Sequence, residues 1–457
     1  MAETKLQPHQ RAALKKLDKT DSLLLYHDMG SGKTLTALGA SERYKSHANV
    51  IGPASLKNNF KKEKAKHNIK ASTSYTTYSK PSTKRENALL VFDEAHLMGQ
   101  TTSKRSRLPD THQGRKELFM TGTPIRNHPS ELVPIMRGLG VDIPRDPKVF
   151  NKRYIEEELV YPNVTGRLKG IKPGVEYKAK NLSDFRKQLR GKVHYYKPSK
   201  GKGYPEVKKE VVTVDMSEKQ LESYRQLMGG SPDLQYKIRH GLPTAKTETN
   251  KMNAFLNATR QISNTPRAYR SDTTLADAPK LQAATKEIVK RYKTNPNYRG
   301  VTYSNYLESG VNPMAQRLEK HNIPYAKYTG KLSDKQKQET VEAFNTGKVK
   351  HLLVSGAGAE GLDLKGVRLS QILELHWNKA KTRQVNARGN RYMSHAHLPP
   401  EQRNLTIQRY VASVPENAFT KKKFKSADEY MYDLTNKKQR LNNQFLNALQ
   451  QVGSSPT

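Results

Sequence analysis

Short apolar runs alternate along the chain with segments whose apolar residues recur at helical spacing. Runs of this kind are typical of strands buried on both faces of a parallel sheet, and the helical segments are typical of crossover connections. The alternation occurs in two series, and each series predicts one α/β lobe. The first series has runs at 22–26, 48–51, 88–92 and 117–120, and the second has runs at 300–304, 325–328, 351–355, 371–375 and 406–411.

Helical patterns accompany both series. An amphipathic pattern over 5–17 predicts a short helix after Pro8. Proline is favoured in the first turn of a helix, where its missing N–H is not needed. The polar stretch Ser72–Ser82 is interpreted as a loop, either a plain connection or one that hydrogen-bonds phosphates. Further helices are expected at 35–45, 55–67, 129–139, 312–321 and 333–344.

The region 141–280 differs in composition, because it is rich in Lys, Arg, Tyr, Gly and Pro. Inside it, 206–215 alternates as a strand, and Ser217 with Gln220 forms a capping box that opens a helix to about residue 228. A second capping box starts at Ser426, and the apolar residues after it recur at near-helical spacing. We expect this C-terminal helix to pack on the second lobe.

The sequence thus predicts an α/β fold of two parallel-sheet lobes, with a basic, partly helical insertion between them and a C-terminal helix. The expected segments are 1–140 for the first lobe, 141–280 for the insertion, 281–420 for the second lobe and 421–457 for the helix and tail.

Charge narrows the classes of partner. The chain has 81 Lys+Arg against 42 Asp+Glu, a formal net charge of +39. A chain this basic is expected to meet a polyanion: nucleic acid first, an anionic membrane surface second. A generally lysine-rich proteome is the alternative explanation.

There are no cysteines, which excludes disulfides and Cys-ligated zinc. No apolar run is long enough to span a bilayer and no signal peptide is evident, so we expect an intracellular protein.

The strongest chemical signal is the loop from His27 to Thr34, which joins a strand to a helix. Glycine-bearing loops of this kind point backbone N–H groups at phosphates, and the following helix N-terminus adds positive potential. In this pattern Gly30, Ser31 and Gly32 form the cradle, Lys33 reaches the β- and γ-phosphates, and Thr34 holds Mg²⁺. The full signature has glycine at the position of His27, so an ordinary strand-to-helix turn is the alternative.

Two adjacent carboxylates, Asp93 and Glu94, end the apolar strand 88–92. A carboxylate at the carboxyl end of a parallel strand is well placed to hold the Mg²⁺ of a nucleotide, and the second carboxylate can orient and deprotonate the attacking water. The alternative is that the two carboxylates are simply the solvated end of a strand. The phosphate loop in the preceding βα unit favours the nucleotide site instead.

With these residues the chain resembles superfamily 2 helicase-type ATPases. Asp93-Glu94-Ala95-His96 resembles their DEAH box, and Thr121-Gly122-Thr123-Pro124-Ile125-Arg126-Asn127 is typical of the SWI/SNF-like branch. The resemblance implies two RecA-like lobes and places Gln10, in Leu6–Gln10, on the adenine side. It also implies that Gly52–Leu56 and the following Asn58-Asn59-Phe60 meet DNA phosphates.

The second lobe carries matching motifs. The stretch 354–364 resembles motif V, with Gly361 and Asp363, and the stretch 384–391 resembles motif VI, with Gln384, Arg388 and Arg391. The resemblance implies that these residues face the nucleotide. Guanidinium groups suit the charge that spreads over the γ-phosphate oxygens in the transition state, so both arginines are candidate catalytic residues.

The stretches 374–378 and 391–403 narrow the resemblance to the nucleoside triphosphatase I group of poxviruses and other large DNA viruses. The resemblance implies ATP and Mg²⁺ as cofactors and an ATP-driven motor on duplex DNA. The alternatives are a strand-separating or branch-migrating helicase on duplex or branched DNA, a transcription-coupled viral ATPase, and a non-catalytic basic virion protein.

Possible partners are DNA most of all, then RNA, and a polymerase or a replication or recombination factor. No membrane association is expected. If the protein is viral, the expected location is the host cytoplasm or the virion.

Overall fold

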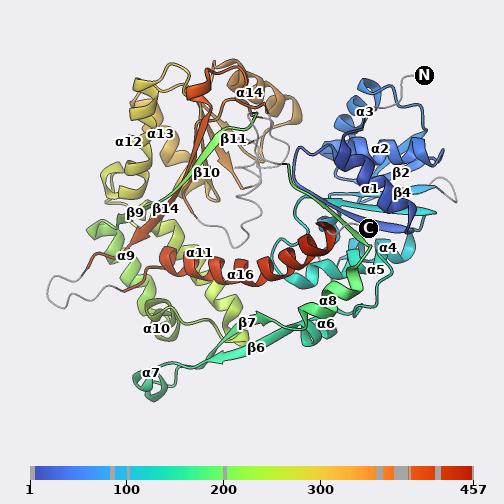
Figure 1. The fold of residues 1–457 in the computed structure, drawn as a ribbon. Coiled ribbons are helices and arrows are strands. Elements are labelled where there is room, and N and C mark those ends of the chain that lie inside the picture. The colour runs from blue at the N-terminus through green and yellow to red at the C-terminus, as the bar shows by residue number, and fades with distance from the viewer. Residues whose placement is uncertain are drawn as a thin grey trace. The chain divides into compact units, whose positions relative to one another are not determined.

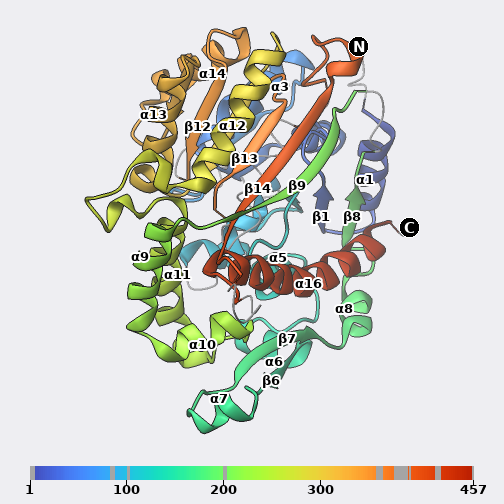
Figure 2. The same cartoon turned by 90° about the vertical axis from the view of Figure 1, so that its left-hand side faces the viewer.

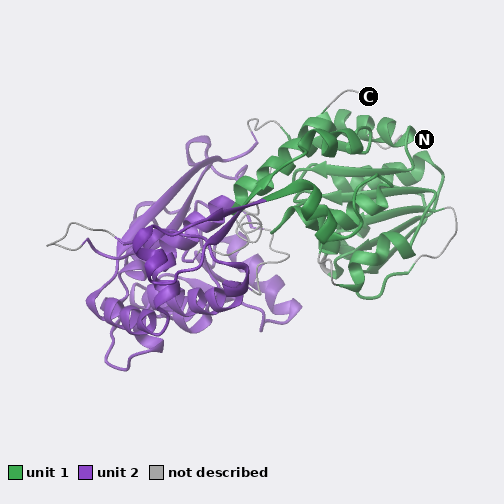
Figure 3. Ribbon diagram, turned by 90° about the horizontal axis from the view of Figure 1, so that it is seen from below, with its two compact units in different colours: residues 1–156, 177–199, 438–457 green, residues 157–176, 200–437 purple. Residues whose placement is uncertain are grey.

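A computed structural model describes the chain at residues 6–82, 88–99, 103–198, 203–356, 364–374, 390, 393–416 and 424–454. Contacts divide it into two compact units, which Figure 3 distinguishes by colour. Unit 1 comprises Met1–Glu156, Tyr177–Ser199 and Lys438–Thr457, and unit 2 comprises Glu157–Glu176 and Lys200–Lys437.

Unit 1 is built on a six-stranded parallel sheet in the order β3-β2-β4-β5-β1-β8. All four expected strands are present and the structure adds two, β3 and β8. The strands are β1 (Ser22–His27), β2 (Ala48–Gly52), β3 (Thr73–Thr77), β4 (Leu89–Asp93), β5 (Lys116–Thr121) and β8 (Val193–Tyr196), and the helices are α1 (Pro8–Asp18), α2 (Lys33–Arg43), α3 (Lys57–Lys66), α4 (Leu108–Thr111), α5 (Val133–Gly138), α6 (Pro147–Tyr154) and α8 (Leu182–Leu189).

The central strands of this sheet are buried on both faces, which explains their unbroken apolar runs. On one face, Leu23 and Leu25 of β1 pack with residues of α1, α2 and α3. Figure 1 shows these three helices beside the sheet. On the other face, Leu24 of β1 joins a core with α5, α6, α8 and the second half of the C-terminal helix. Side chains that alternate along a strand therefore supply two separate cores.

Unit 2 contains a second six-stranded parallel sheet, in the order β11-β12-β10-β13-β14-β9 (Figure 2). Helices α12 and α13 supply the core on one face, and α14 packs on the other. The strands are β9 (Glu206–Asp215), β10 (Gly300–Ser304), β11 (Tyr325–Tyr328), β12 (His351–Ser355), β13 (Leu369–Ile372) and β14 (Asn404–Ser413), and the helices are α12 (Pro279–Thr294), α13 (Asn312–Lys320) and α14 (Asp334–Thr346).

A separate helical core in unit 2 joins α9 (Glu218–Gly229), α10 (Pro232–His240) and α11 (Thr249–Asn264) to the first turns of α16 (Ala427–Ser454). Both expected capping boxes are confirmed: Ser217 with Gln220 opens α9, and Ser426 with Glu429 opens α16. The remaining elements are a two-stranded sheet of β6 (Ile155–Val160) and β7 (Gly174–Ala179) and the short helix α7 (Val164–Leu168) between them.

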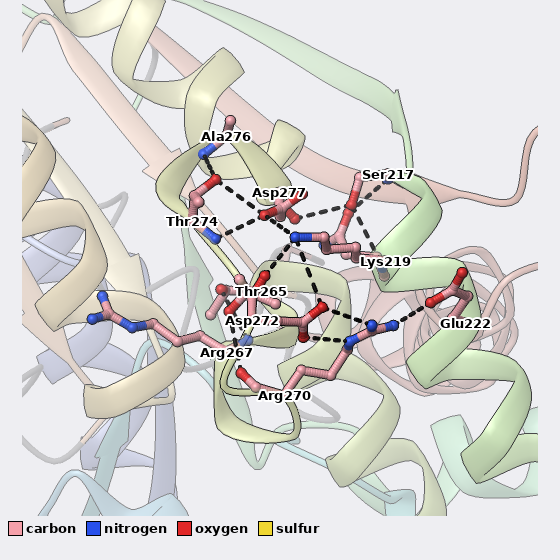
Figure 4. Close-up of polar contacts among 12 residues, drawn as sticks. Ser217, Lys219, Glu222, Thr265, Arg267, Arg270, Asp272, Thr274, Ala276 and Asp277 are labelled. Atoms are coloured by element: carbon pink, nitrogen blue, oxygen red, sulfur yellow. Dashed lines mark hydrogen bonds and ion pairs between the residues drawn. The ribbon is translucent and has the colours of Figure 1, made fainter.

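The connection between α11 and α12 is held by a polar network on the surface of unit 2 (Figure 4). Arg270 makes ion pairs with Asp272, at 2.9 Å, and with Glu222 of α9. Lys219 of α9 lies 3.6 Å from the carboxylate of Asp277. Exposed pairs of this kind each contribute less than about 1 kcal/mol, so the network mainly fixes the course of the connection.

Three features differ from the sequence-based expectations. The segment 141–280 divides between the units, because β8 joins the first sheet and β9 joins the second. Ser72–Ser82 is not simply a loop, because Thr73–Thr77 forms β3 beside β2. The C-terminal helix does not pack on the second lobe alone, since its first turns join the unit 2 core and Phe445 and Leu449 are buried in unit 1. Among the described residues, no helix combines the length and apolar character that crossing a bilayer requires.

Candidate active site

The loop between β1 and α2 has the geometry that its glycines predict. Gly30 has a φ of +79° and Gly32 a φ of +75°, left-handed conformations that glycine adopts without steric cost. Gly32 is the N-cap of α2, so the helix begins at Lys33 and Thr34 lies in its first turn. The free N–H groups of a first helical turn and the helix dipole together favour an anion at this position.

Lys33 lies over the loop. Its Nζ donates to the carbonyl oxygens of His27, at 3.1 Å, and of Asp28, at 3.2 Å. Ser31 is buried, and its hydroxyl has no hydrogen-bond partner among the described residues. An ammonium, a buried hydroxyl and a helix N-terminus therefore converge on one short loop, which suits a polyphosphate.

Gln10 of α1 joins this loop. It is 2% exposed, and both ends of its amide are used. Its Oε1 accepts from the backbone N–H of Gln7 at 2.8 Å, and its Nε2 donates to the carbonyl of Gly32 at 3.0 Å. A Cβ added at Gly32 would lie 2.6 Å from that Nε2, so only glycine fits here without a shift. The neighbouring His9 donates from Nε2 to the carbonyl of Ser31 at 2.8 Å.

Asp93 is the last residue of β4 and Glu94 follows it directly, and β5 lies between β4 and β1 in the sheet. Burial raises the pKa of Asp93 to about 7, the charge of Glu94 adds to this rise, and Lys33 opposes it. Glu94 has a φ of +52°, a left-handed conformation that is uncommon outside glycine and directs the chain away from the strand.

A chain of polar contacts connects Glu94 to the loop that follows β5. Glu94 Oε2 lies 3.3 Å from Nδ1 of His96, and this nitrogen lies 2.8 Å from the hydroxyl of Thr121. Burial lowers the pKa of His96 to about 4, so the ring is neutral at pH 7 and its 3.3 Å contact with Glu94 is not an ion pair. Thr121 also accepts from the backbone N–H of Thr123 at 3.0 Å.

The loop after β5 lies against the phosphate loop. A Cβ added at Gly122 would be 3.2 Å from the carbonyl oxygen of His27. The next turn is held by Glu131, whose carboxylate accepts from the backbone N–H groups of Arg126 and Asn127 at 2.7 and 3.0 Å. Motifs separated by about ninety residues in the sequence thus meet at the carboxyl ends of three strands, where ligands bind in open α/β sheets.

One part of this site was not expected from the sequence. His27 is fully buried, and its Nε2 lies 2.7 Å from Nδ1 of His194 in β8. Burial lowers the pKa of His27 to about 2 and that of His194 to about 4, so both rings are neutral at pH 7. Tyr196, two residues on, stacks on His9 with 3.6 Å between ring centroids. The short run Val193–Tyr196 was the available signal.

The residues present fit a Mg²⁺ ion. Mg²⁺ prefers oxygen ligands and is usually held by one or two protein groups together with phosphate oxygens. Asp93 supplies a carboxylate whose burial disfavours its charged form, and a nearby cation relieves that cost. Thr34 supplies a hydroxyl in the first turn of α2.

The expected residues of the second lobe lie outside the described residues. These are Gly361, Asp363, Gln384, Arg388 and Arg391. The expected site is therefore described only for its unit 1 half, which comprises Gln10, Gly30, Ser31, Gly32, Lys33, Thr34, Asp93 and Glu94.

Comparison with known proteins gives two family matches and a set of viral relatives. The SNF2-related domain matches residues 55–268, and the helicase conserved C-terminal domain matches residues 279–393. A protein of Acanthamoeba polyphaga mimivirus, named as an ATP-dependent RNA helicase, is 30% identical over 96% of this chain and 95% of its own length. The termination factor NPH-I homolog of African swine fever virus is 25% identical over 95% of this chain and 76% of its own length.

Proposed function

Because the chain belongs to the SNF2-related, helicase-type ATPases of superfamily 2, we propose that it is a motor that hydrolyses ATP to translocate on duplex DNA. One observation carries the proposal above all. The path from Glu94 through His96 to Thr121 connects the expected water-activating carboxylate with a loop that lies against the phosphate loop. Such a path lets the state of the nucleotide change a second loop, which a motor requires.

In this proposal each residue of the unit 1 site has a separate task. Lys33 binds the β- and γ-phosphates, and the backbone of Gly30–Gly32 cradles them. Glu94 orients the attacking water and accepts its proton, and the neutral His96 holds Glu94 in place. Gln10 recognises adenine and ties that recognition to the loop through Gly32.

Thr34 and Asp93 would hold Mg²⁺, which supplies charge neutralisation at the transferring phosphoryl group when bound. Arg388 and Arg391 complete the site by stabilising the charge on the γ-phosphate in the transition state. Gly361, Asp363 and Gln384 are proposed to line the same nucleotide. Because these residues belong to the second helicase motif set, hydrolysis would require both motif sets together.

The net charge of +39 supports a nucleic-acid track. Lys and Arg side chains that neutralise phosphates supply sequence-independent binding, which a translocating motor needs. Duplex DNA is proposed as the track because the motif Thr121–Asn127 has the form typical of the SWI/SNF-like branch. In keeping with its viral relatives, we propose that the protein serves a large DNA virus, in the host cytoplasm or the virion.

A transcription-coupled ATPase is the second candidate, because the African swine fever virus relative is named a termination factor. The mimivirus relative is named an RNA helicase, so RNA is the alternative track. The ATPase rate distinguishes a DNA track from an RNA track. It is measured without nucleic acid and with single-stranded DNA, duplex DNA, branched DNA and RNA, at matched nucleotide concentration. The proposal expects the highest rate with duplex DNA. A rate that rises only with RNA would overturn it.

A further inference from the structure

Strand β3 is the outermost strand of the unit 1 sheet on the side of β2, and it is polar throughout, Thr-Ser-Tyr-Thr-Thr. The backbone N–H of Ala48 donates to the carbonyl of Ser72 at 3.0 Å, which sets the register of the parallel pair. In a parallel ladder, successive residues of a strand point their N–H and C=O groups to opposite sides. Residues 74 and 76 therefore point these groups toward β2, and Thr73 and Tyr75 point theirs away from it. The outer edge therefore offers both donors and acceptors.

A groove of about 430 Å³ runs along this edge. One wall is α3, which contributes Lys57, Lys61 and Lys64 on one face. The other wall is β3, which contributes Thr73–Thr76. The aromatic ring of Tyr75 packs on Phe60 of α3, with 5.7 Å between ring centroids, and its hydroxyl donates to the carbonyl of Pro53 at 2.9 Å. These contacts fix the two walls relative to each other.

The lysines of this groove are not neutralised within the part of the chain that the structure describes. Lys57 and Lys61 are exposed, and Lys64 is half-buried with its Nζ 3.5 Å from the hydroxyl of Thr73. Among the ion pairs of the described residues, none includes any of the three. None of the described residues that line the groove is acidic. Its charge is complementary to an acidic ligand.

We propose that this groove binds an extended acidic segment of a partner protein, which adds to the sheet as a strand beside β3. Lysines four and three residues apart on α3 are separated by about 6 and about 4.5 Å along the helix. Carboxylates two residues apart on an added strand are separated by about 6.7 Å, which flexible lysine side chains can follow. The main chain supplies affinity and the lysines select acidic side chains.

A nucleic-acid backbone is the other polyanion that fits lysines, but it fits the strand edge less well. Phosphate oxygens only accept hydrogen bonds, so they cannot satisfy the outward carbonyls of Thr73 and Tyr75. A peptide strand brings donors and acceptors in the alternation that the edge presents. The edge thus favours the peptide.

The test measures fluorescence anisotropy of a labelled peptide of about eight residues that alternates Glu and Val, a length typical of strands. A peptide that alternates Lys and Val is the charge control. Lys61→Glu combined with Lys64→Glu should weaken binding of the acidic peptide at least about tenfold. The basic peptide should not bind the wild-type chain.

The strand edge is tested by a matched pair of variants. Thr73→Pro removes the outward N–H without touching the bonds to β2, whereas Thr73→Ala keeps it. Thr73→Pro should weaken peptide binding about tenfold and Thr73→Ala by less than about twofold, with unchanged thermal unfolding and basal ATPase in both. Equal binding by the two variants would overturn strand addition. Failure of the acidic peptide to bind, with loss of single-stranded DNA affinity in the lysine double variant, would assign the groove to nucleic acid instead.

Discussion

The amide of Gln10 donates to the carbonyl of Gly32 at 3.0 Å, which joins the first helix of the chain directly to the phosphate loop. Gln10 is 2% exposed, and its other amide end accepts from the N–H of Gln7. The side chain is therefore held by α1 before any nucleotide arrives. A contact to adenine at Gln10 would therefore be transmitted to the loop that is proposed to hold the phosphates.

Replacement of Gln10 by alanine should raise the KM for ATP about tenfold and leave kcat within about threefold. It removes the hydrogen bonds proposed to adenine, each worth about 1 kcal/mol, and leaves the groups proposed to act on the γ-phosphate in place. Steady-state phosphate release measures both constants. Lys15→Ala, on the exposed face of the same helix, is the control and should change neither. A kcat that falls with KM unchanged would contradict the assignment of Gln10 to adenine recognition.

Lys33→Ala should lower ATP turnover about a hundredfold or more, because it removes an ammonium that donates to two carbonyls of the phosphate loop and is proposed to bind the β- and γ-phosphates. The measurement is phosphate release at saturating ATP, with Lys19→Ala, an exposed lysine after α1, as the control. Turnover within about threefold of wild type in the Lys33 variant would show that the loop is an ordinary turn.

Glu94→Gln keeps the size of the side chain and its polar contact with His96 but removes the proposed general base. Turnover should fall about a hundredfold, while the affinity for a fluorescent ATP analogue should stay within about threefold of wild type. Single-turnover hydrolysis and equilibrium titration separate the two effects. Glu63→Gln, a surface carboxylate that contacts only His67 among the ion pairs of the described residues, is the control. Equal loss of binding and turnover would indicate a structural role for Glu94.

The buried His351 should make unit 2 less stable in acid. Its ring nitrogens lie 2.8 Å from the hydroxyls of Tyr298 and Thr302, and burial lowers its pKa to about 3. The unfolded chain, in which the pKa is about 6.5, binds the proton first as pH falls, so the stability is intact above about pH 6.5 and is lost progressively toward pH 3.

The expected loss from this one group is about 2 kcal/mol between pH 7 and pH 5. Urea denaturation of wild type and His351→Gln at the two pH values measures it, and the wild type should lose about 2 kcal/mol more than the variant. His321→Gln, at an exposed position, should behave as wild type does. Identical pH dependence of wild type and His351→Gln would refute the prediction.

The parts of the fold that the sequence predicted correctly are those set by local pattern. The strand before Gly30 follows from one continuous apolar run. The loop up to Lys33 follows from glycines, which adopt left-handed conformations without steric cost. The two capping boxes also lie within four residues of chain, and both are present at Ser217 and Ser426. Neither needed knowledge of distant contacts.

The parts that sequence reasoning missed depend on distant partners. β3 is a half-buried edge strand of Ser, Thr and Tyr, so it lacks the apolar run that marks the central strands. The periodicity of the C-terminal helix is real, but no local signal says which core receives Met431 and which receives Phe445. His194 lies 167 residues from His27, and only the pairing of β8 with β1 brings them together.

Displacement of the third strand of a DNA triplex tests the central claim, ATP-driven translocation on duplex DNA, most directly. With ATP, the wild-type chain should displace the third strand and leave a plain forked duplex nearly intact, and duplex DNA should stimulate hydrolysis more than single strands or RNA do. Arg388→Ala should abolish displacement and hydrolysis while DNA binding stays nearly intact, because its proposed partner is the γ-phosphate. Efficient unwinding of the fork without triplex displacement, or stimulation by single strands alone, would contradict the account and indicate a strand-separating helicase.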